Sequence, residues 1–152
     1  MTLTQKETSL LTDLKAAEQL CIEKYAKYAA MAKDEELKSV FSSIKETEVS
    51  HLSTITELLS GKEVPMSSES PSATEAKLVC EPSGLPQDDK KEDAFLVKDA
   101  LSMEKHVSGV YNTAVFEFCS PVVRDTLAHI QKEEQNHGEM LYNYLECNGM
   151  YN

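Results

Sequence analysis

The sequence predicts an all-α protein, a four-helix bundle built from two antiparallel helical hairpins that a long crossover joins. Two observations support this prediction. Apolar residues recur at a spacing of about 3.6 on both sides of a central segment, and no alternating strand pattern occurs. The central segment, residues 61–90, holds four of the five prolines and is rich in serine, which is typical of a linker.

The first hairpin is predicted to contain helices over about residues 5–32 and about residues 35–60. Asp34 lies at the break between them, where its carboxylate can cap the second helix. Gly61 follows that helix, at the position where a residue with left-handed backbone commonly ends a helix.

The second hairpin is predicted to contain helices over about residues 91–119 and about residues 121–147. Ser120 is a favourable N-cap, and Pro121 would occupy the first helical position, where its missing N–H costs nothing. Gly149 can end the last helix.

The length of the linker predicts the topology. Adjacent antiparallel helices need only a few connecting residues, whereas residues 61–90 suffice to travel the whole bundle length of about 40 Å. We therefore expect one long crossover between the second and third helices. The chain length of 152 residues favours a single domain that covers residues 1–152.

The charge and hydropathy of the chain argue against several partners. With 26 acidic and 15 basic side chains the formal net charge is -11, which repels phosphate backbones and anionic lipids, so we expect no nucleic acid partner. No apolar run approaches the roughly 18–20 residues that a membrane-spanning helix needs, and the first residues lack a signal-peptide pattern. We therefore expect no membrane partner and a cytoplasmic location.

The four cysteines form no Cys-x-x-Cys pair, so the sequence encodes neither a zinc ribbon nor a rubredoxin-type iron site. They are Cys21, Cys80, Cys119 and Cys147. Because structural disulfides are rare in reducing compartments, we expect all four to be thiols.

Six residues carry the strongest chemical signal. Two Glu-x-x-His motifs supply four of them, and a glutamate 30 positions before each motif supplies the other two. The six residues are Glu18, Glu48, His51, Glu104, Glu134 and His137. The second three follow the first three by 86 positions, and Tyr25 and Tyr111 each follow the leading glutamate by seven. The two halves of the chain are therefore a repeat.

The spacing predicts that the four glutamates meet inside the bundle. The midpoints of the two 30-residue intervals are residues 33 and 119, beside the predicted turns. Each hairpin would thus set its two glutamates side by side, about 22 Å from its turn. Apolar residues flank each glutamate at helical spacing, so all four are expected to point inward.

Four buried carboxylates need compensating positive charge, because their desolvation and repulsion would cost several kcal/mol each. Two divalent metal ions would neutralise them. Oxygen ligands with one imidazole per metal suit iron, our first expectation, or manganese, and ligand softness does not separate these from zinc. A single glutamate in a chain that is 27% charged is ordinarily a solvated surface residue. Six residues with duplicated spacing predict a dinuclear metal site.

Five further residues lie near this pattern or outside it. Tyr25 and Tyr111 would either hydrogen-bond a ligating carboxylate or simply fill the core. Cys21, one turn from the first glutamate, is expected to be a small buried residue and not a ligand. His106 and His129 have no such placement and are predicted to lie on the surface.

The six residues and the two glutamate-to-tyrosine spacings resemble the ferritin-like superfamily, in particular bacterioferritins and rubrerythrins, over nearly the full chain outside the linker. The resemblance implies a ferritin-like four-helix bundle with these ligands: Glu18 and Glu104 terminal, Glu48 and Glu134 bridging, His51 and His137 one to each metal. The sequence departs from these families at Val107, where rubrerythrins add a glutamate, and at Val49, where bacterioferritins place a haem-ligating methionine.

Residues 102–151 are also similar to spore coat protein F-like sequences of endospore-forming bacteria. The similarity lies in the Ser-Pro-x-x-Arg turn at residues 120–124 and in the aromatic, glycine-bearing tail that ends in Met150 and Tyr151. It implies a coat or coat-associated protein of sporulating cells, with other spore coat proteins as partners.

Two functions fit these patterns. The first is an oxidoreductase, a ferroxidase or peroxide-handling site, in which two metals change oxidation state and dioxygen or peroxide is the substrate. The second is a structural spore coat protein, whose metal site ties the hairpins together or is vestigial. A homodimer is the expected oligomer for either function.

Overall fold

A computed structural model describes residues 1–66 and 80–151 of the chain. Within these residues there are four α-helices and no strands. The helices are α1 (Gln5–Met31), α2 (Glu35–Leu59), α3 (Gln87–Glu117) and α4 (Pro121–Cys147). The predictions of an all-α protein and of four helices are therefore confirmed.

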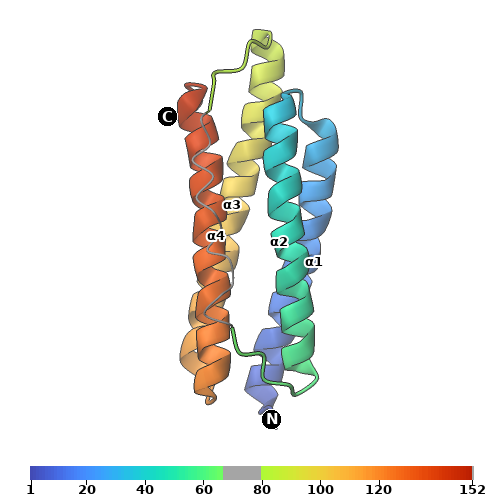
Figure 1. Ribbon diagram of the computed structural model, residues 1–152, viewed down its shortest axis with the longest axis vertical. Coiled ribbons are helices and arrows are strands. Elements are labelled where there is room, and N and C mark those ends of the chain that lie inside the picture. Colours follow the sequence, from blue (N-terminus) through green and yellow to red (C-terminus); the bar gives the residue numbers. More distant parts are fainter. Residues whose placement is uncertain (67–79, 152) are drawn as a thin grey trace.

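The helices pack side by side as an elongated bundle (Figure 1). α1 and α2 form one antiparallel hairpin, α3 and α4 form the other, and the hairpins meet where α1 packs on α3 and α2 packs on α4. α2 ends and α3 begins at opposite ends of the bundle (Figure 1), as a long crossover requires. Of the predicted linker, residues 67–79 lie outside the described residues.

The predicted capping residues occupy both hairpin turns. Asp34 is the N-cap of α2, where its Oδ1 accepts a backbone hydrogen bond at 3.0 Å. Ser120 caps α4, and Pro121 lies in the first turn of that helix.

Gly61 follows α2 with a φ of 84°. A Cβ at Gly61 would lie 2.8 Å from the carbonyl oxygen of Met1, so both backbone conformation and space require glycine there.

The third helix differs from its predicted bounds. α3 begins at Gln87, about a turn before the expected start, and it ends at Glu117. Pro86 provides no side-chain cap, but Asp88 and Asp89 lie in the first turn. Negative charge there interacts favourably with the helix dipole. The acidic end of the predicted linker is therefore helical.

Two buried acids connect the hairpins at their ends. Asp93 on α3 is fully buried, and its carboxylate accepts hydrogen bonds from the N–H groups of Lys33 and Asp34 at 2.8 and 2.9 Å. Glu7 on α1 accepts one from the N–H of Cys119 at 3.0 Å. Glu7 and Asp93 are related by the 86-residue repeat. Each hairpin therefore supplies an acid that stabilises the turn of the other hairpin.

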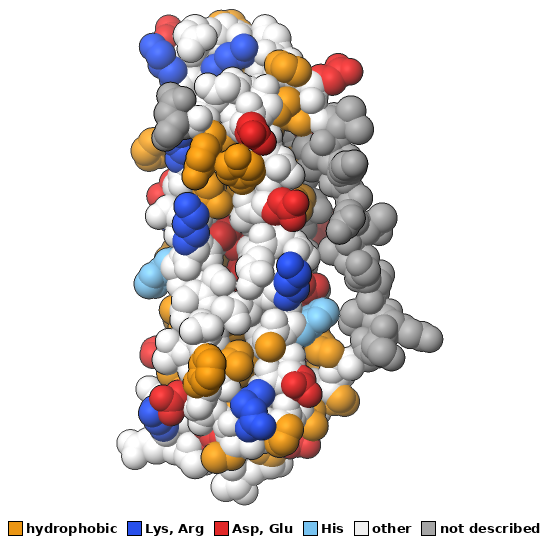
Figure 2. Space-filling view, turned by 90° about the vertical axis from the view of Figure 1, so that its left-hand side faces the viewer, with side chains coloured by type: hydrophobic (Ala, Val, Ile, Leu, Met, Phe, Trp, Pro, Cys, Tyr) orange, Lys and Arg blue, Asp and Glu red, His pale blue; other side chains and the backbone are white. Residues whose placement is uncertain are grey.

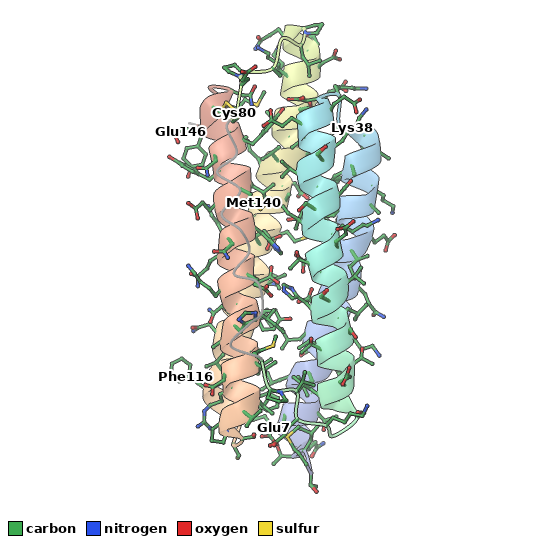
Figure 3. The ribbon with its side chains drawn as sticks, viewed as in Figure 1. Glu7, Lys38, Cys80, Phe116, Met140 and Glu146 are labelled. Carbon is green, nitrogen blue, oxygen red and sulfur yellow. A yellow bond between two sulfur atoms is a disulfide. The ribbon has the colours of Figure 1, made fainter. Side chains whose placement is uncertain are left out.

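A disulfide joins Cys80, near the end of the crossover, to Cys147 at the end of α4 (Figure 3). The two Cα atoms are 6.1 Å apart, a separation that a disulfide spans. The expectation of four thiols is therefore wrong for this pair, because the fold brings together residues that are 67 positions apart. Cys21 is a buried free thiol, and Cys119 is an exposed one.

The surface carries charge of both signs. On the side where α4 lies in Figure 1, acidic and basic side chains are interspersed, and hydrophobic side chains form separate groups (Figure 2). Among the described residues, no helix is long and apolar enough to cross a membrane.

Candidate metal centre

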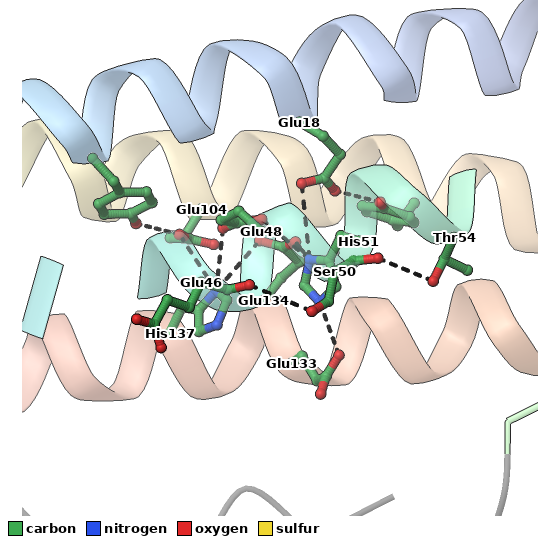
Figure 4. Close-up of polar contacts among 12 residues, drawn as sticks. Glu18, Glu46, Glu48, Ser50, His51, Thr54, Glu104, Glu133, Glu134 and His137 are labelled. Atoms are coloured by element: carbon green, nitrogen blue, oxygen red, sulfur yellow. Dashed lines mark hydrogen bonds and ion pairs between the residues drawn. The ribbon is translucent and has the colours of Figure 1, made fainter. Parts of the chain in front are cut away.

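All six predicted ligand residues lie together in the interior of the bundle (Figure 4). Each is at most 4% exposed, although every one has an ionisable side chain. They come from all four helices: Glu18 from α1, Glu48 and His51 from α2, Glu104 from α3, Glu134 and His137 from α4. The six side chains therefore converge, as the spacing predicts.

The helical register explains why these side chains converge. In each Glu-x-x-His motif the glutamate and the histidine are three residues apart, so both project from one face of the helix. Leu11, Leu14, Ile44 and Leu141 lie on the same faces and are fully buried or nearly so. The apolar stripes that drive helix packing thus carry the acids and the imidazoles into the interior.

The ligand atoms form two overlapping groups. The first group contains Glu18, Glu48, His51 and Glu134, and the second contains Glu48, Glu104, Glu134 and His137. Within each group, one ligand atom per residue can be chosen so that all lie within 4.8 Å of one another. Glu48 and Glu134 belong to both groups, so each of these carboxylates faces two positions at once.

Both histidines direct Nδ1 toward the shared carboxylates. Nδ1 of His51 lies 3.1 Å from Oε2 of Glu48 and 3.0 Å from Oε1 of Glu134. Nδ1 of His137 lies 3.3 Å from Oε1 of Glu48 and 3.7 Å from Oε1 of Glu104. The two rings are stacked with centroids 5.9 Å apart, so the imidazoles lie on one side of a compact centre.

Tyr25 and Tyr111 hydrogen-bond across the hairpins. The hydroxyl of Tyr25 donates to Oε1 of Glu104, and the hydroxyl of Tyr111 donates to Oε1 of Glu18. Both rings are fully buried. Each tyrosine therefore fills the core and also orients the carboxylate that the opposite hairpin contributes.

Burial raises the affinity of two carboxylates for protons. Desolvation, with a further contribution from neighbouring Glu48, raises the pKa of Glu18 to about 9. Desolvation and neighbouring Glu104 raise the pKa of Glu134 to about 10. The pKa of Glu48 is lowered, because the nearby imidazoles of His137 and His51 favour its charged form by more than desolvation opposes it. Without a bound cation, Glu18 and Glu134 therefore have a higher affinity for protons than Glu48 has.

The imidazoles are held in their charged form. Desolvation alone would lower the pKa of His51, but the adjacent carboxyl groups of Glu133, Glu134 and Glu48 raise it to about 12. Desolvation of His137 is likewise outweighed by Glu104 and Glu48, which raise its pKa to about 10. Protons thus supply the positive charge that the carboxylates require.

Unpartnered atoms indicate that protons alone do not satisfy this centre. Among the described residues, six buried atoms of the cluster have no hydrogen-bond partner: Glu18 Oε2, Glu48 Oε1, Glu104 Oε2, both carboxylate oxygens of Glu134, and His137 Nδ1. A buried polar atom without a partner costs about 1–3 kcal/mol. Carboxylate oxygens and imidazole nitrogen are donors that divalent iron, manganese and zinc accept. The donor set therefore fits two divalent cations.

Glu133 is a residue of this region that the apolar pattern does not predict. Its Oε2 lies 2.8 Å from Nε2 of His51, on the side of the ring away from the carboxylate cluster. His129 approaches the other oxygen, with Nε2 at 3.6 Å from Oε1. His129 is one-third exposed and His106 is exposed, so both lie at the surface as predicted.

Cys21 lies close to the cluster and is nearly fully buried. Desolvation and the negative charge of the surrounding glutamates raise the pKa of its thiol. A thiol that resists ionisation is a poor metal ligand, which agrees with its prediction as a core residue.

The fold and the cluster define a class: a four-helix bundle with a buried carboxylate and imidazole centre shared by two hairpins. Residues 92–152 match the sequence model of the Coat F domain family. The match covers most of α3, all of α4 and the tail, and it confirms the similarity to spore coat protein F-like sequences in the second half. No curated protein and no solved structure matches the chain.

Proposed function

We propose that this protein is a spore coat-associated protein whose bundle binds two divalent metal ions that tie its two hairpins together. The Coat F match over the second hairpin supports coat association. The two overlapping ligand groups that share Glu48 and Glu134 carry the metal part of the proposal. This arrangement resembles the dinuclear carboxylate centres of ferritin-like bundles.

Each proposed metal position draws on both hairpins. The first group combines three residues of α1 and α2 with Glu134 of α4, and the second combines three residues of α3 and α4 with Glu48 of α2. A cation at either position would therefore crosslink the hairpins. Because the unfolded chain lacks such a site, the free energy of metal binding would add to the free energy of folding.

Metal removal and a matched pair of variants test this proposal. Purified protein is expected to contain about two divalent ions per chain, and exhaustive chelation is expected to lower its melting temperature. The Glu48→Gln/Glu134→Gln variant should bind neither ion. The control, Glu46→Gln/Glu139→Gln, removes two exposed carboxylates from the same helices and should bind both. Chelation that leaves the melting temperature of the wild-type protein unchanged would contradict the structural role of the metal.

Coat association requires a separate experiment. In sporulating cells that produce this chain, immunogold labelling should place it at the coat layer, and coat extraction should release it. Labelling confined to the cytoplasm of vegetative cells would contradict coat association and leave the metal experiment unaffected.

A second candidate function is oxidoreductase chemistry at the same centre. Each ligand group offers four residues, whereas iron and manganese bound by oxygen and nitrogen ligands usually have further coordination positions. Such positions would allow dioxygen or peroxide to bind, with iron or manganese supplying the electrons. Anaerobic loading with ferrous iron, followed by dioxygen or peroxide, tests this candidate. A near-ultraviolet ferric band with consumption of the oxidant supports it, and stable ferrous iron contradicts it.

A further inference from the structure

The two halves of the centre differ in the residues around the ligands. Glu133 of α4 contacts the Nε2 edge of His51, at 2.8 Å. The 86-residue repeat relates His51 to His137 and relates Glu133 to Thr47. Thr47 is half-buried on α2, and a threonine has no carboxylate to offer His137.

We infer that Glu133 makes the two metal positions unequal, so that the position between Glu18 and His51 binds a divalent cation more tightly than the position between Glu104 and His137. This inference rests on the proposed metal centre and adds an order in which its positions fill. Glu133 acts as a positioning residue, because it reaches the cation only through His51.

The geometry around His51 explains the stronger binding. The carboxylate of Glu133 accepts a hydrogen bond from the Nε2–H of His51. An imidazole that binds a metal ion is neutral, and in the neutral ring this bond leaves the lone pair on Nδ1. Nδ1 is the atom that faces Glu48 and Glu134, at 3.1 and 3.0 Å. A carboxylate on the outer nitrogen also makes the ligating nitrogen more basic, and loss of such a partner typically weakens metal affinity by about 10–100-fold.

Glu133 is itself held in place. Its side chain is 25% exposed, which limits solvent screening of its charge. Its second oxygen faces His129 at 3.6 Å. The 2.8 Å contact of its first oxygen with Nε2 of His51 therefore joins two side chains that are each fixed by a further partner. The contacts of His137 with carboxylate oxygens of the described residues all involve Nδ1. None of them involves Nε2, so His137 has no counterpart of Glu133 within this part of the chain.

Cobalt(II) binding to the full chain tests the inference. Titration of metal-free protein, followed by visible absorption and calorimetry, should resolve a tight and a weak step. Crystals with one cobalt per chain should show stronger anomalous density beside His51 than beside His137. Glu133→Gln should weaken the tight step by about tenfold and equalise the two densities. Glu139→Gln, an exposed change on the same helix, should alter neither.

A gain-of-function variant keeps the test independent of any loss of folding. Thr47→Glu should strengthen the weak step by about tenfold and raise the density beside His137. Equal densities in the wild-type protein, or unequal densities that Glu133→Gln leaves unchanged, would overturn the inference while the metal centre stands. Absence of any cobalt binding would instead overturn the proposed function.

Discussion

The α1–α2 hairpin supplies Glu18, Glu48 and His51 to the centre, and the α3–α4 hairpin supplies the residues 86 positions later. Both hairpins also provide a tyrosine that bonds the opposite hairpin and an acid that holds its turn. The hairpins differ outside these contacts, at Cys21 against Val107 and at Thr47 against Glu133. The shared residues therefore include the centre, its tyrosines and the turn-holding acids, whereas the contact of Glu133 with the opposite hairpin occurs on one side only.

The Coat F match also distinguishes the two hairpins. It begins at residue 92 and covers little beyond the second hairpin. That hairpin contains only three of the six residues of the buried cluster, and the group to which they belong also includes Glu48 from α2. The centre consequently depends on a hairpin outside the matched region, and the predictions below test how far the two hairpins are equivalent.

The largest effect is expected from Glu18 and Glu104, each of which belongs to only one of the two residue groups. Glu18→Gln should empty the metal position beside His51, and Glu104→Gln should empty the metal position beside His137. Each variant should therefore bind about one cobalt(II) ion per chain. Inductively coupled plasma mass spectrometry and anomalous scattering would measure the amount and the location. Retention of two ions by either variant would contradict the assignment of that glutamate as a ligand.

The next effect is the release of protons when the centre binds metal. We expect the metal-free centre to hold about four protons at pH 7, because the pKa values of Glu18, Glu134, His51 and His137 are all raised. Loading with two divalent ions should release about four protons, and metal affinity should rise with pH. Calorimetry in buffers of different ionisation enthalpy measures the release. Release of no protons would contradict the proposed exchange.

The same pKa values fix how stability depends on pH without metal. The folded protein binds more protons than the unfolded chain from about pH 4.5, the ordinary value for glutamate, up to about pH 12. The stability of the metal-free protein should therefore fall as pH rises through this range. The lowered pKa of Glu48 acts in the opposite sense and removes stability as pH falls below about 4.5. Thermal melts of chelated protein between pH 5 and pH 9 check the sign.

The end of the second hairpin is bonded to the crossover by a disulfide, and the end of the first hairpin has no equivalent cysteine. Cys147 ends α4 and is bonded to Cys80, whereas the equivalent residue of the first hairpin is Gly61. Cys80→Ser/Cys147→Ser should lower the free energy of unfolding by about 2–4 kcal/mol. Cys119→Ser, which removes an exposed free thiol, is the control and should have little effect. A count of four thiols in denatured, unreduced protein would contradict the disulfide.

The smallest effect is expected at the two turn-holding acids. Asp93→Ala should cost about 2–3 kcal/mol, because the variant leaves two backbone N–H groups without an acceptor. Glu7→Ala should cost a similar amount, because it removes one hydrogen bond from the opposite turn and also the capping-box bonds with Thr4 at the start of α1. Urea unfolding of both variants provides the comparison. A cost well below about 1 kcal/mol for either variant would contradict the role of that acid in holding the opposite turn.

The sequence was sufficient for the helices and the six ligand residues because both depend on local spacing. A 30-residue interval centred on a turn sets two glutamates at one height, and the Glu-x-x-His spacing sets the histidine on the same face. The 86-residue repeat also relates Glu7 to Asp93, so a search of the repeat for acids near the helix starts would have found this pair.

Other features depend on contacts that spacing does not encode. The partner of Cys80 is decided by the path of a crossover without periodicity, so the sequence offered no reason to pair it with Cys147. Glu133 adjoins Glu134 in the chain and points about 100° away from it around the helix, as a solvated glutamate would. Only the packing of α4 on α2 brings Glu133 to His51.

The most direct test of the metal centre is the amount of metal in protein purified without added metal or chelator. Mass spectrometry of wild-type protein beside the Glu48→Gln/Glu134→Gln variant and the Glu46→Gln/Glu139→Gln control gives the comparison. Two divalent ions per chain in the wild-type protein and the control, and none in the variant, is the predicted result. Equal metal in all three proteins would contradict a centre built on the two shared carboxylates.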